Sequence, residues 1–197
     1  MLNKDNILNV LEANKVVLTG HFKLSSGLHS ERYIQCAKIF ENPMLSMQII
    51  EILVQNISQN IERKNFDTIL SPAMGGVLCG YEVARQMLCK NIFVERVDNV
   101  FTLKRGFSVK KGERILLIED VVTTGKSTLE ACKVIEELGA KVVGMASIID
   151  RREKDNNSLP FALTSVLKLN VPTYKTENLP DHLKNIPWVK PGSRVQN

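Results

Sequence analysis

Short aliphatic runs alternate along this chain with stretches whose apolar residues recur at helical spacing. The longest runs lie at 115–118 and 142–149, and shorter ones lie at 68–70 and 92–94. Runs of this kind are typical of strands buried on both faces of a sheet. Helical stripes lie between and around them, at 43 to about 63, 77–88 and 129–138. Strands separated by helices predict an α/β fold built on a doubly wound parallel sheet.

Two further segments depart from this alternation. Residues 95–107 alternate apolar and polar residues around the turn pair Asp98-Asn99, which predicts a projecting hairpin arm or a mobile loop. A further strand is expected over 161–169, and four prolines punctuate the mostly irregular tail that follows it. No internal repeat or linker divides the chain, so we expect a single domain over 1–197.

Two carboxylates and a hydroxyl-rich turn follow the run at 115–118. Glu119 and Asp120 come where this strand is expected to end, and Val121-Val122-Thr123-Thr124-Gly125-Lys126-Ser127 leads into the helix at 129–138. A strand, a polar turn and a helix start direct free backbone N–H groups and the positive end of the helix dipole at one point. The hydroxyls can donate to phosphate oxygens, whereas the carboxylates suit sugar hydroxyls or an associated metal ion. A phosphorylated ribose would suit both the hydroxyl turn and the acid pair. The alternative is that this segment is only a strand end followed by an ordinary helix-capping turn.

A second strand–turn–helix unit strengthens the ligand hypothesis. The run at 68–70 ends in Ser71-Pro72-Ala73-Met74-Gly75-Gly76, and the helix at 77–88 follows. Alone, this unit would be interpreted as a tight crossover turn, but two such units favour one ligand with two phosphate-bearing groups. Two common nucleotide motifs are excluded: Asp120 stands where a Walker A loop needs glycine, and no G-x-G-x-x-G follows a strand.

Composition narrows the class of protein. Of the 197 residues, 44% are hydrophobic and 24% are charged, as in ordinary globular proteins. A net charge of +5 suits small anionic substrates better than nucleic acid, which would need a longer basic stripe or a reading helix. The four cysteines have no C-x-x-C spacing and predict buried free thiols in a reducing compartment. With no signal-peptide core and no apolar run of membrane-spanning length, we expect a cytoplasmic protein with no membrane or nucleic-acid partner.

The segment Ile118-Glu119-Asp120-Val121-Val122-Thr123-Thr124-Gly125 resembles the phosphoribosyl-pyrophosphate (PRPP) motif of the type I phosphoribosyltransferases. The resemblance implies that Glu119 and Asp120 hold the ribose hydroxyls and that residues 121–127 wrap the 5′-phosphate. It also implies that the turn Ala73-Met74-Gly75-Gly76 cradles pyrophosphate through backbone amides, since the lysine often found there is missing. Mg²⁺ is implied as the cofactor, with no metal site predicted from protein ligands.

Across nearly its whole length the chain is similar to the orotate phosphoribosyltransferases within that family. Residues 21–34 resemble part of the hood over the base, which is expected from about 1–40 and the C-terminal tail around a core of about 41–170. His21 and His29, within this segment, are expected to be turn or surface residues because no metal spacing relates them. The pair Asp150-Arg151 resembles the orotate-binding pair, so Arg151 and Thr123 are the residues implied to bind orotate. An arginine suits this role because its guanidinium can fork onto a carboxylate.

Residues 95–107 resemble the catalytic flap of the same enzymes. The resemblance implies a homodimer in which the flap closes over the partner's site, and Arg96, Lys104 and Arg105 are the cations available to meet the pyrophosphate, with the choice among them left open. The implied reaction transfers phosphoribose from PRPP to N1 of orotate, giving orotidine 5′-monophosphate and pyrophosphate in pyrimidine (UMP) biosynthesis. Asp120, Arg96 and Lys104 are the predicted catalytic residues.

Two alternatives remain open at this point. One is a purine phosphoribosyltransferase, against which Arg151 and the hood segment argue. The other is a regulator that binds PRPP without turning it over; such a protein would ordinarily carry a DNA- or RNA-binding element, and no helix-turn-helix segment precedes the core.

Overall fold

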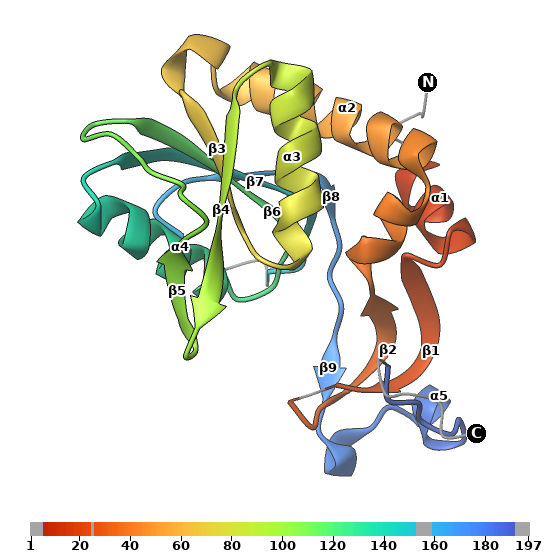
Figure 1. Ribbon diagram of the computed structural model, residues 1–197. Coiled ribbons are helices and arrows are strands. Elements are labelled where there is room, and N and C mark those ends of the chain that lie inside the picture. Colours follow the sequence, from red (N-terminus) through yellow and green to blue (C-terminus); the bar gives the residue numbers. More distant parts are fainter. Residues whose placement is uncertain (1–5, 25, 153–158, 192–197) are drawn as a thin grey trace.

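The computed structural model describes residues 6–24, 26–152 and 159–191, and its centre is a six-stranded sheet (Figure 1). The strand order is β5-β4-β3-β6-β7-β8. The strands are β3 (Thr68–Pro72), β4 (Lys90–Val97), β5 (Val100–Leu103), β6 (Arg114–Val122), β7 (Lys141–Asp150) and β8 (Leu163–Lys168). Every neighbouring pair is parallel except β4–β5, which is antiparallel. The predicted α/β fold with a parallel sheet is confirmed.

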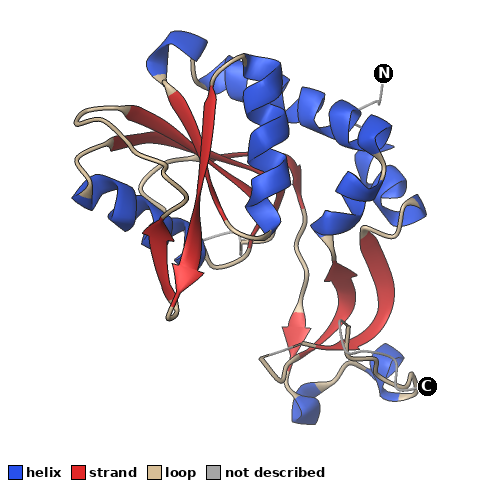
Figure 2. Cartoon of the chain, in the orientation of Figure 1, coloured by secondary structure: helices blue, strands red, loops and turns tan. Residues whose placement is uncertain are grey.

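Helices cover both faces of this sheet (Figure 2). The helices α2 (Pro43–Asn60) and α3 (Gly75–Met87) pack on one face with α1 (Ile7–Ala13) beside them, and α4 (Lys126–Glu137) packs on the other. Leu116 and Ile118 of β6 belong to the first hydrophobic cluster, whereas Ile115 and Leu117 belong to the second. All four side chains are fully buried, which explains why β6 is an unbroken aliphatic run rather than an alternating one.

The end of α2 and the bounds of β8 differ from the prediction. The helix α2 begins at Pro43 as expected, with the Asn42 side chain accepting hydrogen bonds from the N–H groups of Met44 and Leu45. It ends at Asn60 rather than near residue 63, because Ile61 is extended and packs its side chain against Gly144. The strand β8 is shorter than 161–169, since its pairing with β7 begins only at Leu163.

The segment at 95–107 contains a β-hairpin, which we call the arm (β4 and β5). Asp98 and Asn99 have φ angles of 49° and 65°, the left-handed conformation that a two-residue hairpin turn requires. Arg96 pairs with Phe101 across the two strands. The predicted hairpin is therefore present, and it projects from the sheet on the side where β3 and β6 end (Figure 1).

A second, three-stranded sheet combines the two ends of the chain and is called the hood. It consists of β1 (Val17–Lys23), β2 (His29–Ile34) and β9 (Thr173–Tyr174), with α5 (Asp181–Lys184) following in the tail. His21 and His29 are 4% and 2% exposed, so the expectation that they are turn or surface residues was wrong. Their rings are joined by a hydrogen bond of 2.7 Å, and Nδ1 of His21 donates to the carbonyl of Ile186 in the tail. The tail covers both rings, which the local sequence around them does not reveal.

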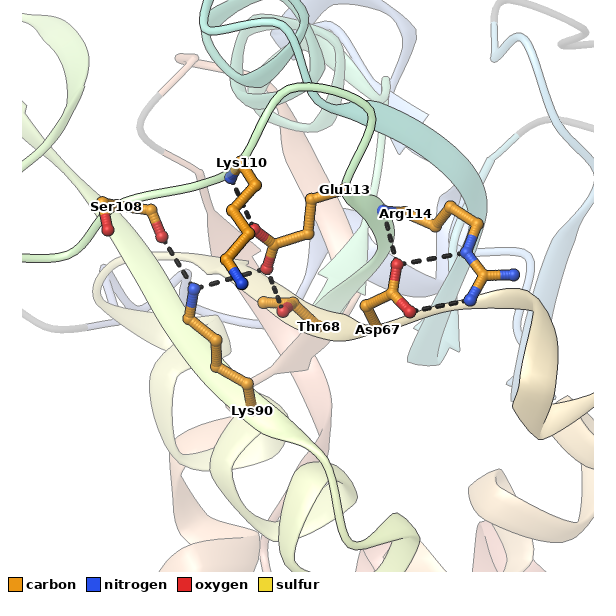
Figure 3. A network of polar contacts seen from close by, with 7 residues as sticks. All are labelled: Asp67, Thr68, Lys90, Ser108, Lys110, Glu113 and Arg114. Carbon is orange, nitrogen blue, oxygen red and sulfur yellow. Dashed lines mark hydrogen bonds and ion pairs between the residues drawn. The ribbon is translucent and has the colours of Figure 1, made fainter.

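A polar network lies where β3, β4 and β6 begin, at the end of the large sheet opposite the arm. Figure 3 shows its residues from close by. One carboxylate oxygen of Glu113 accepts hydrogen bonds from the hydroxyl of Thr68 at 2.5 Å and from Nζ of Lys90 at 3.3 Å. The other accepts from the backbone N–H of Lys110 at 2.6 Å. Beside it, the guanidinium of Arg114 donates to both carboxylate oxygens of Asp67. These contacts fix the segment that returns from the arm to β6.

No helix in the described parts of the chain combines the length and the apolarity needed to cross a membrane.

Candidate active site

A cavity of about 370 Å³ lies at the carboxyl ends of β3 and β6, bounded by the starts of α3 and α4. Most of the residues predicted to bind PRPP lie on its wall. The lining residues are Pro72, Ala73, Gly75, Arg96, Phe101, Glu119, Asp120, Val121, Val122, Thr123, Thr124, Gly125, Lys126, Ser127 and Thr128. Met74, Gly76, Lys104 and Arg151 are predicted site residues that do not line it.

Glu119 and Asp120 are buried carboxylates at the floor of this cavity. Glu119 is 7% exposed, and burial together with the neighbouring Asp120 carboxylate raises its pKa to about 8, although a hydrogen bond from Thr128 opposes the shift. Burial also raises the pKa of Asp120, against a hydrogen bond that its Oδ1 accepts from the N–H of Val121 at 2.9 Å. Neither carboxylate forms an ion pair with a described residue. The pair therefore favours ligands that donate hydrogen bonds or carry positive charge.

Two buried thiols hold the backbone of this acid pair from behind. Sγ of Cys36 donates to the carbonyl of Asp120 at 3.7 Å, and Sγ of Cys79 donates to the carbonyl of Glu119 at 3.6 Å. Burial raises the pKa of both thiols well above the ordinary value, so they are protonated and unreactive. Buried free cysteines were predicted, and all four are free, but Cys89 is only half-buried. No pattern in the sequence indicates that Cys36 and Cys79 contact the acid pair.

The turn at 123–127 forms the second wall. Gly125 has a φ of 80°, the left-handed conformation that glycine adopts without strain, and it directs the chain into α4 at Lys126. Thr123, Thr124 and Ser127 are exposed, and all three line the cavity. The N–H groups of the first helical turn have no partners further back in the helix, so hydroxyls and amides converge on the same space. This arrangement can bind a phosphate group.

The turn at 73–76 forms the third wall. The helix α3 begins at Gly75, two residues earlier than predicted, so the glycine pair belongs to its first turn. An added Cβ on Gly76 would lie 3.1 Å from the carbonyl oxygen of Ile118 and 3.5 Å from Oε2 of Glu119. The absence of side chains here lets the start of α3 approach the acid pair. Met74 is 85% exposed and points away from the core.

Arg96 reaches the cavity of its own chain from the arm, whereas the resemblance implied a flap that closes over the partner's site. Its guanidinium lies 4.0 Å from the centre of the Phe101 ring, donates to the carbonyl of Asn99 at 2.6 Å, and pairs with Glu130 of α4 at 2.5 Å. Arg105, two residues after the end of the arm, instead pairs with Glu95 at 2.8 Å. Lys104, the other predicted catalytic cation, follows the end of β5 and is exposed.

Arg151 follows β7 and lies beside the same strand end. Its backbone N–H donates to the carbonyl of Val122 at 2.8 Å. Burial lowers the pKa of its guanidinium, and its Nε is buried without a hydrogen-bond partner in the described part of the chain. Asp150 and Arg152 on either side are joined by hydrogen bonds of 3.0 Å. A buried guanidinium nitrogen with no acceptor is costly unless a ligand supplies one.

Comparisons with known proteins agree with this geometry. Residues 37–161 match the phosphoribosyl transferase domain family. A protein from Caldanaerobacter subterraneus subsp. tengcongensis named orotate phosphoribosyltransferase is 43% identical over 98% of this chain and 99% of its own length. A protein of the same name from Rhizorhabdus wittichii is 42% identical over 98% of each chain. Among solved structures, orotate phosphoribosyltransferase from Aeropyrum pernix superimposes with a TM-score of 0.72 at 22% identity, covering 83% of this chain and 93% of its own, which supports the fold.

Proposed function

The chain belongs to the orotate phosphoribosyltransferase family, and on this premise we propose that it transfers phosphoribose from PRPP to N1 of orotate. The products are orotidine 5′-monophosphate and pyrophosphate, and the reaction serves pyrimidine biosynthesis. The observation that carries the choice of base is Arg151, whose buried Nε has no hydrogen-bond partner among the described residues and lies beside the strand end that carries the PRPP turn. The carboxylate of orotate supplies the acceptor that this guanidinium needs.

Different residues of the cavity bind different parts of PRPP. Thr123, Thr124 and Ser127, with the amides that start α4, hold the 5′-phosphate. Glu119 and Asp120 accept hydrogen bonds from the ribose hydroxyls. The amides of the turn at 73–76 hold the pyrophosphate. These contacts hold C1 of the ribose next to N1 of the base. The two substrates then react within one complex and do not depend on a chance encounter in solution.

The chemical difficulty is the departure of pyrophosphate while positive charge develops on the ribose ring. In this proposal the Asp120 carboxylate stabilises that charge, and Arg96 at the cavity wall and Lys104, which follows the arm, stabilise the negative charge of the leaving group. The arm, by closing, would exclude water and prevent hydrolysis of PRPP. No protein nucleophile is required.

The donor set fits Mg²⁺ that enters with PRPP. Glu119 and Asp120 offer carboxylate oxygens without a cationic partner among the described residues, and no group of three or more metal-ligating side chains exists in that part of the chain. Mg²⁺ is usually held by one or two carboxylates together with substrate phosphates rather than by a cage of protein ligands. When bound, it would neutralise phosphate charge.

We also propose a homodimer formed through the outer face of α2 and α3. Leu78 and Tyr81 are 55% and 58% exposed and lie three residues apart on α3. Met44 and Met47 of α2 are exposed as well, and the side chain of Gln86 in α3 donates to the carbonyl of Met47, so the two helices adjoin there. The four free cysteines fit a reducing compartment, which supports the cytoplasm as the location.

The test follows the ultraviolet absorbance of orotate after protein, Mg²⁺ and PRPP are mixed, with adenine, hypoxanthine and uracil in parallel. Loss of the orotate signal that depends on both PRPP and metal supports the proposal. Turnover of a purine instead would overturn the role of Arg151. PRPP binding without turnover of any base would identify a regulator. Analytical ultracentrifugation of the Tyr81→Glu variant tests the dimer, since a charge on this face should shift the population to monomer.

A further inference from the structure

We propose that Glu130 is a positioning residue for Arg96: it holds the arm guanidinium at the wall of the PRPP cavity. This inference rests on the proposed function, because it concerns the binding of PRPP in that cavity. Glu130 lies on α4, one turn after the hydroxyl turn, and is not itself a lining residue. Its role would therefore be exerted through Arg96.

Three contacts from two elements fix the Arg96 guanidinium. One terminal nitrogen donates to the carbonyl of Asn99 at the tip of the arm, and the other donates to Oε2 of Glu130 at 2.5 Å. The ring of Phe101 lies beneath the group, 4.0 Å away, and also lines the cavity. An arginine side chain has five N–H donors, and these two hydrogen bonds leave the others for a ligand. The anchored group is thus ready to bind an anion without first being ordered.

The pair also joins two parts of the site that are otherwise separate. Arg96 belongs to the arm, whereas Glu130 belongs to the helix whose first turn is proposed to hold the 5′-phosphate. Of the two contacts made by its terminal nitrogens, only the one to Glu130 reaches outside the arm. Without it, the arm would keep its hairpin pairing but lose this connection to α4. We therefore expect the consequence of losing Glu130 to appear in PRPP binding rather than in folding.

The location of the pair, rather than its intrinsic strength, gives it this role. Arg96 and Glu130 have side chains that are 38% and 36% exposed, and ion pairs at such exposure contribute little to stability. A role in stability alone would therefore leave PRPP binding unchanged in a Glu130 variant. Two other roles for Glu130 are conceivable. As a negative charge near an anion site, it would weaken PRPP binding through space; as a competitor for Arg96, it would have to be displaced by PRPP.

Two substitutions separate these roles. Glu130→Gln removes the charge and keeps the length, whereas Glu130→Asp keeps the charge and is one methylene shorter. A positioning role requires both charge and reach, so both variants should raise the KM for PRPP, roughly tenfold for a guanidinium displaced by about 1 Å. The KM for orotate should change much less. Glu137→Gln is the matched control, since it removes the same charge from the far end of α4.

The experiment measures kcat and both KM values, together with calorimetric binding of PRPP in the presence of Mg²⁺ and the melting temperature of each variant. The proposal expects weaker PRPP binding in both Glu130 variants, unchanged melting temperatures, and little further effect of Glu130→Gln in an Arg96→Gln background, which removes the cation that Glu130 holds. Tighter PRPP binding in Glu130→Gln, or wild-type binding in Glu130→Asp, would overturn it. So would an equal effect of Glu130→Gln with and without Arg96. Because binding is measured apart from turnover, a failure of the proposed orotate reaction would be seen separately, as absence of turnover in the wild type.

Discussion

Gly75 lies directly against the carboxylate of Asp120. A Cβ added to Gly75 would be 2.6 Å from Oδ2 and 2.7 Å from Oδ1 of Asp120, closer than real Cβ contacts occur. The proposed pyrophosphate turn and the proposed ribose carboxylate therefore share one surface. Any side chain on Gly75 must displace Asp120 or the start of α3.

The first prediction is that Gly75→Ala lowers kcat/KM by at least about tenfold, because displacing a positioned group by about 1 Å can cost that much or more. Folding should be affected little, since Gly75 lies in a helix and alanine favours helices. Steady-state kinetics and thermal melting measure both effects. Gly20→Ala is the control, because a Cβ there would make only an ordinary contact with Phe22. Full activity in Gly75→Ala would contradict the proposed role of Asp120.

The second prediction concerns the pH dependence of stability. The pKa of Glu119 is raised to about 8 in the folded protein from 4.5, so between these values the unfolded chain binds fewer protons than the folded one. Stability of the ligand-free protein should therefore fall as the pH rises through this range, by a few kcal/mol in total. Glu119→Gln should remove most of this slope, melt near the wild-type temperature at pH 5, and melt roughly 5–10 °C higher at pH 8.5.

The neighbouring Asp120 also contributes to the pH dependence of stability. Its own pKa is raised by burial, so a residual slope in Glu119→Gln is attributable to Asp120. Thermal melting from pH 5 to 8.5 gives the measurement, with Glu137→Gln as the exposed control. An unchanged slope in Glu119→Gln would show that the buried proton is not on Glu119.

The third prediction addresses the choice of base. Arg151→Lys should raise the KM for orotate about tenfold or more, because an ammonium group cannot make the forked contact of a guanidinium with a carboxylate. The KM for PRPP serves as an internal control and should stay close to the wild-type value. Steady-state kinetics with each substrate varied in turn makes the comparison. A larger change in the KM for PRPP than for orotate would indicate that Arg151 binds the phosphates of PRPP and not the base.

The parts of this site that the sequence predicts are local. The strand, the acid pair, the hydroxyl turn and the helix start are contiguous at 114–128, so their order alone places Glu119 and Asp120 beside the turn that starts α4. Backbone periodicity and turn chemistry are sufficient for this prediction, and the same holds for the hairpin turn at Asp98-Asn99.

The parts that sequence reasoning missed depend on contacts between distant segments. Glu130 meets Arg96 across 34 positions, and His21 is covered by the carbonyl of Ile186, 165 positions away. Neither contact follows from a local pattern. Cys79 looks like an ordinary core residue of α3, and only the packing of α3 against β6 brings its thiol to the carbonyl of Glu119. Tertiary packing determines such pairs, and no spacing rule encodes them.

The fourth prediction concerns the network at the amino edge of the sheet (Figure 3). Glu113→Gln should destabilise the protein by about 1–3 kcal/mol, because hydrogen bonds to a charged and largely buried carboxylate are lost or weakened. Turnover should remain at the wild-type level, since the network lies at the edge opposite the cavity. Urea unfolding and steady-state kinetics test the two statements. A loss of turnover without a loss of stability would contradict this purely structural role.

The lowered pKa of Glu113 also predicts the pH below which its contribution to stability is lost. Burial alone would raise the pKa of Glu113, but hydrogen bonds from Thr68, from the N–H of Lys110 and from Lys90 outweigh it and lower the pKa below 4.5. Its stabilising contribution is therefore complete above pH 4.5 and is lost as the pH falls through the lower folded value. Below that value, the wild type and Glu113→Gln should converge in stability.

The fifth prediction is that the hood loosens as the pH falls below about 6.5. The hydrogen bonds assign the protons of the two rings: His21 donates from Nδ1 to Ile186, so its Nε2 accepts from Nδ1 of His29, whose Nε2 accepts from the hydroxyl of Thr176 at 3.3 Å. Burial, with His21 and Lys23 nearby, lowers the pKa of His29. The unfolded chain therefore binds more protons just below pH 6.5, and the stability contributed by a neutral His29 decreases as the pH falls through its folded pKa.

Two substitutions at His29 test this assignment. Asparagine can place an N–H donor near the position of Nδ1 but does not titrate, so His29→Asn should retain the contact to His21 and flatten the pH dependence. Alanine removes the donor and leaves Nε2 of buried His21 unsatisfied, so His29→Ala should cost about 1–3 kcal/mol at pH 8, where His29 is neutral. Urea unfolding at pH 5.5 and 8, with hydrogen exchange of the segment 176–189, follows both effects. If His29→Asn keeps the wild-type pH dependence, the titrating group lies elsewhere and the two rings serve only as a packed connection between β1 and the tail.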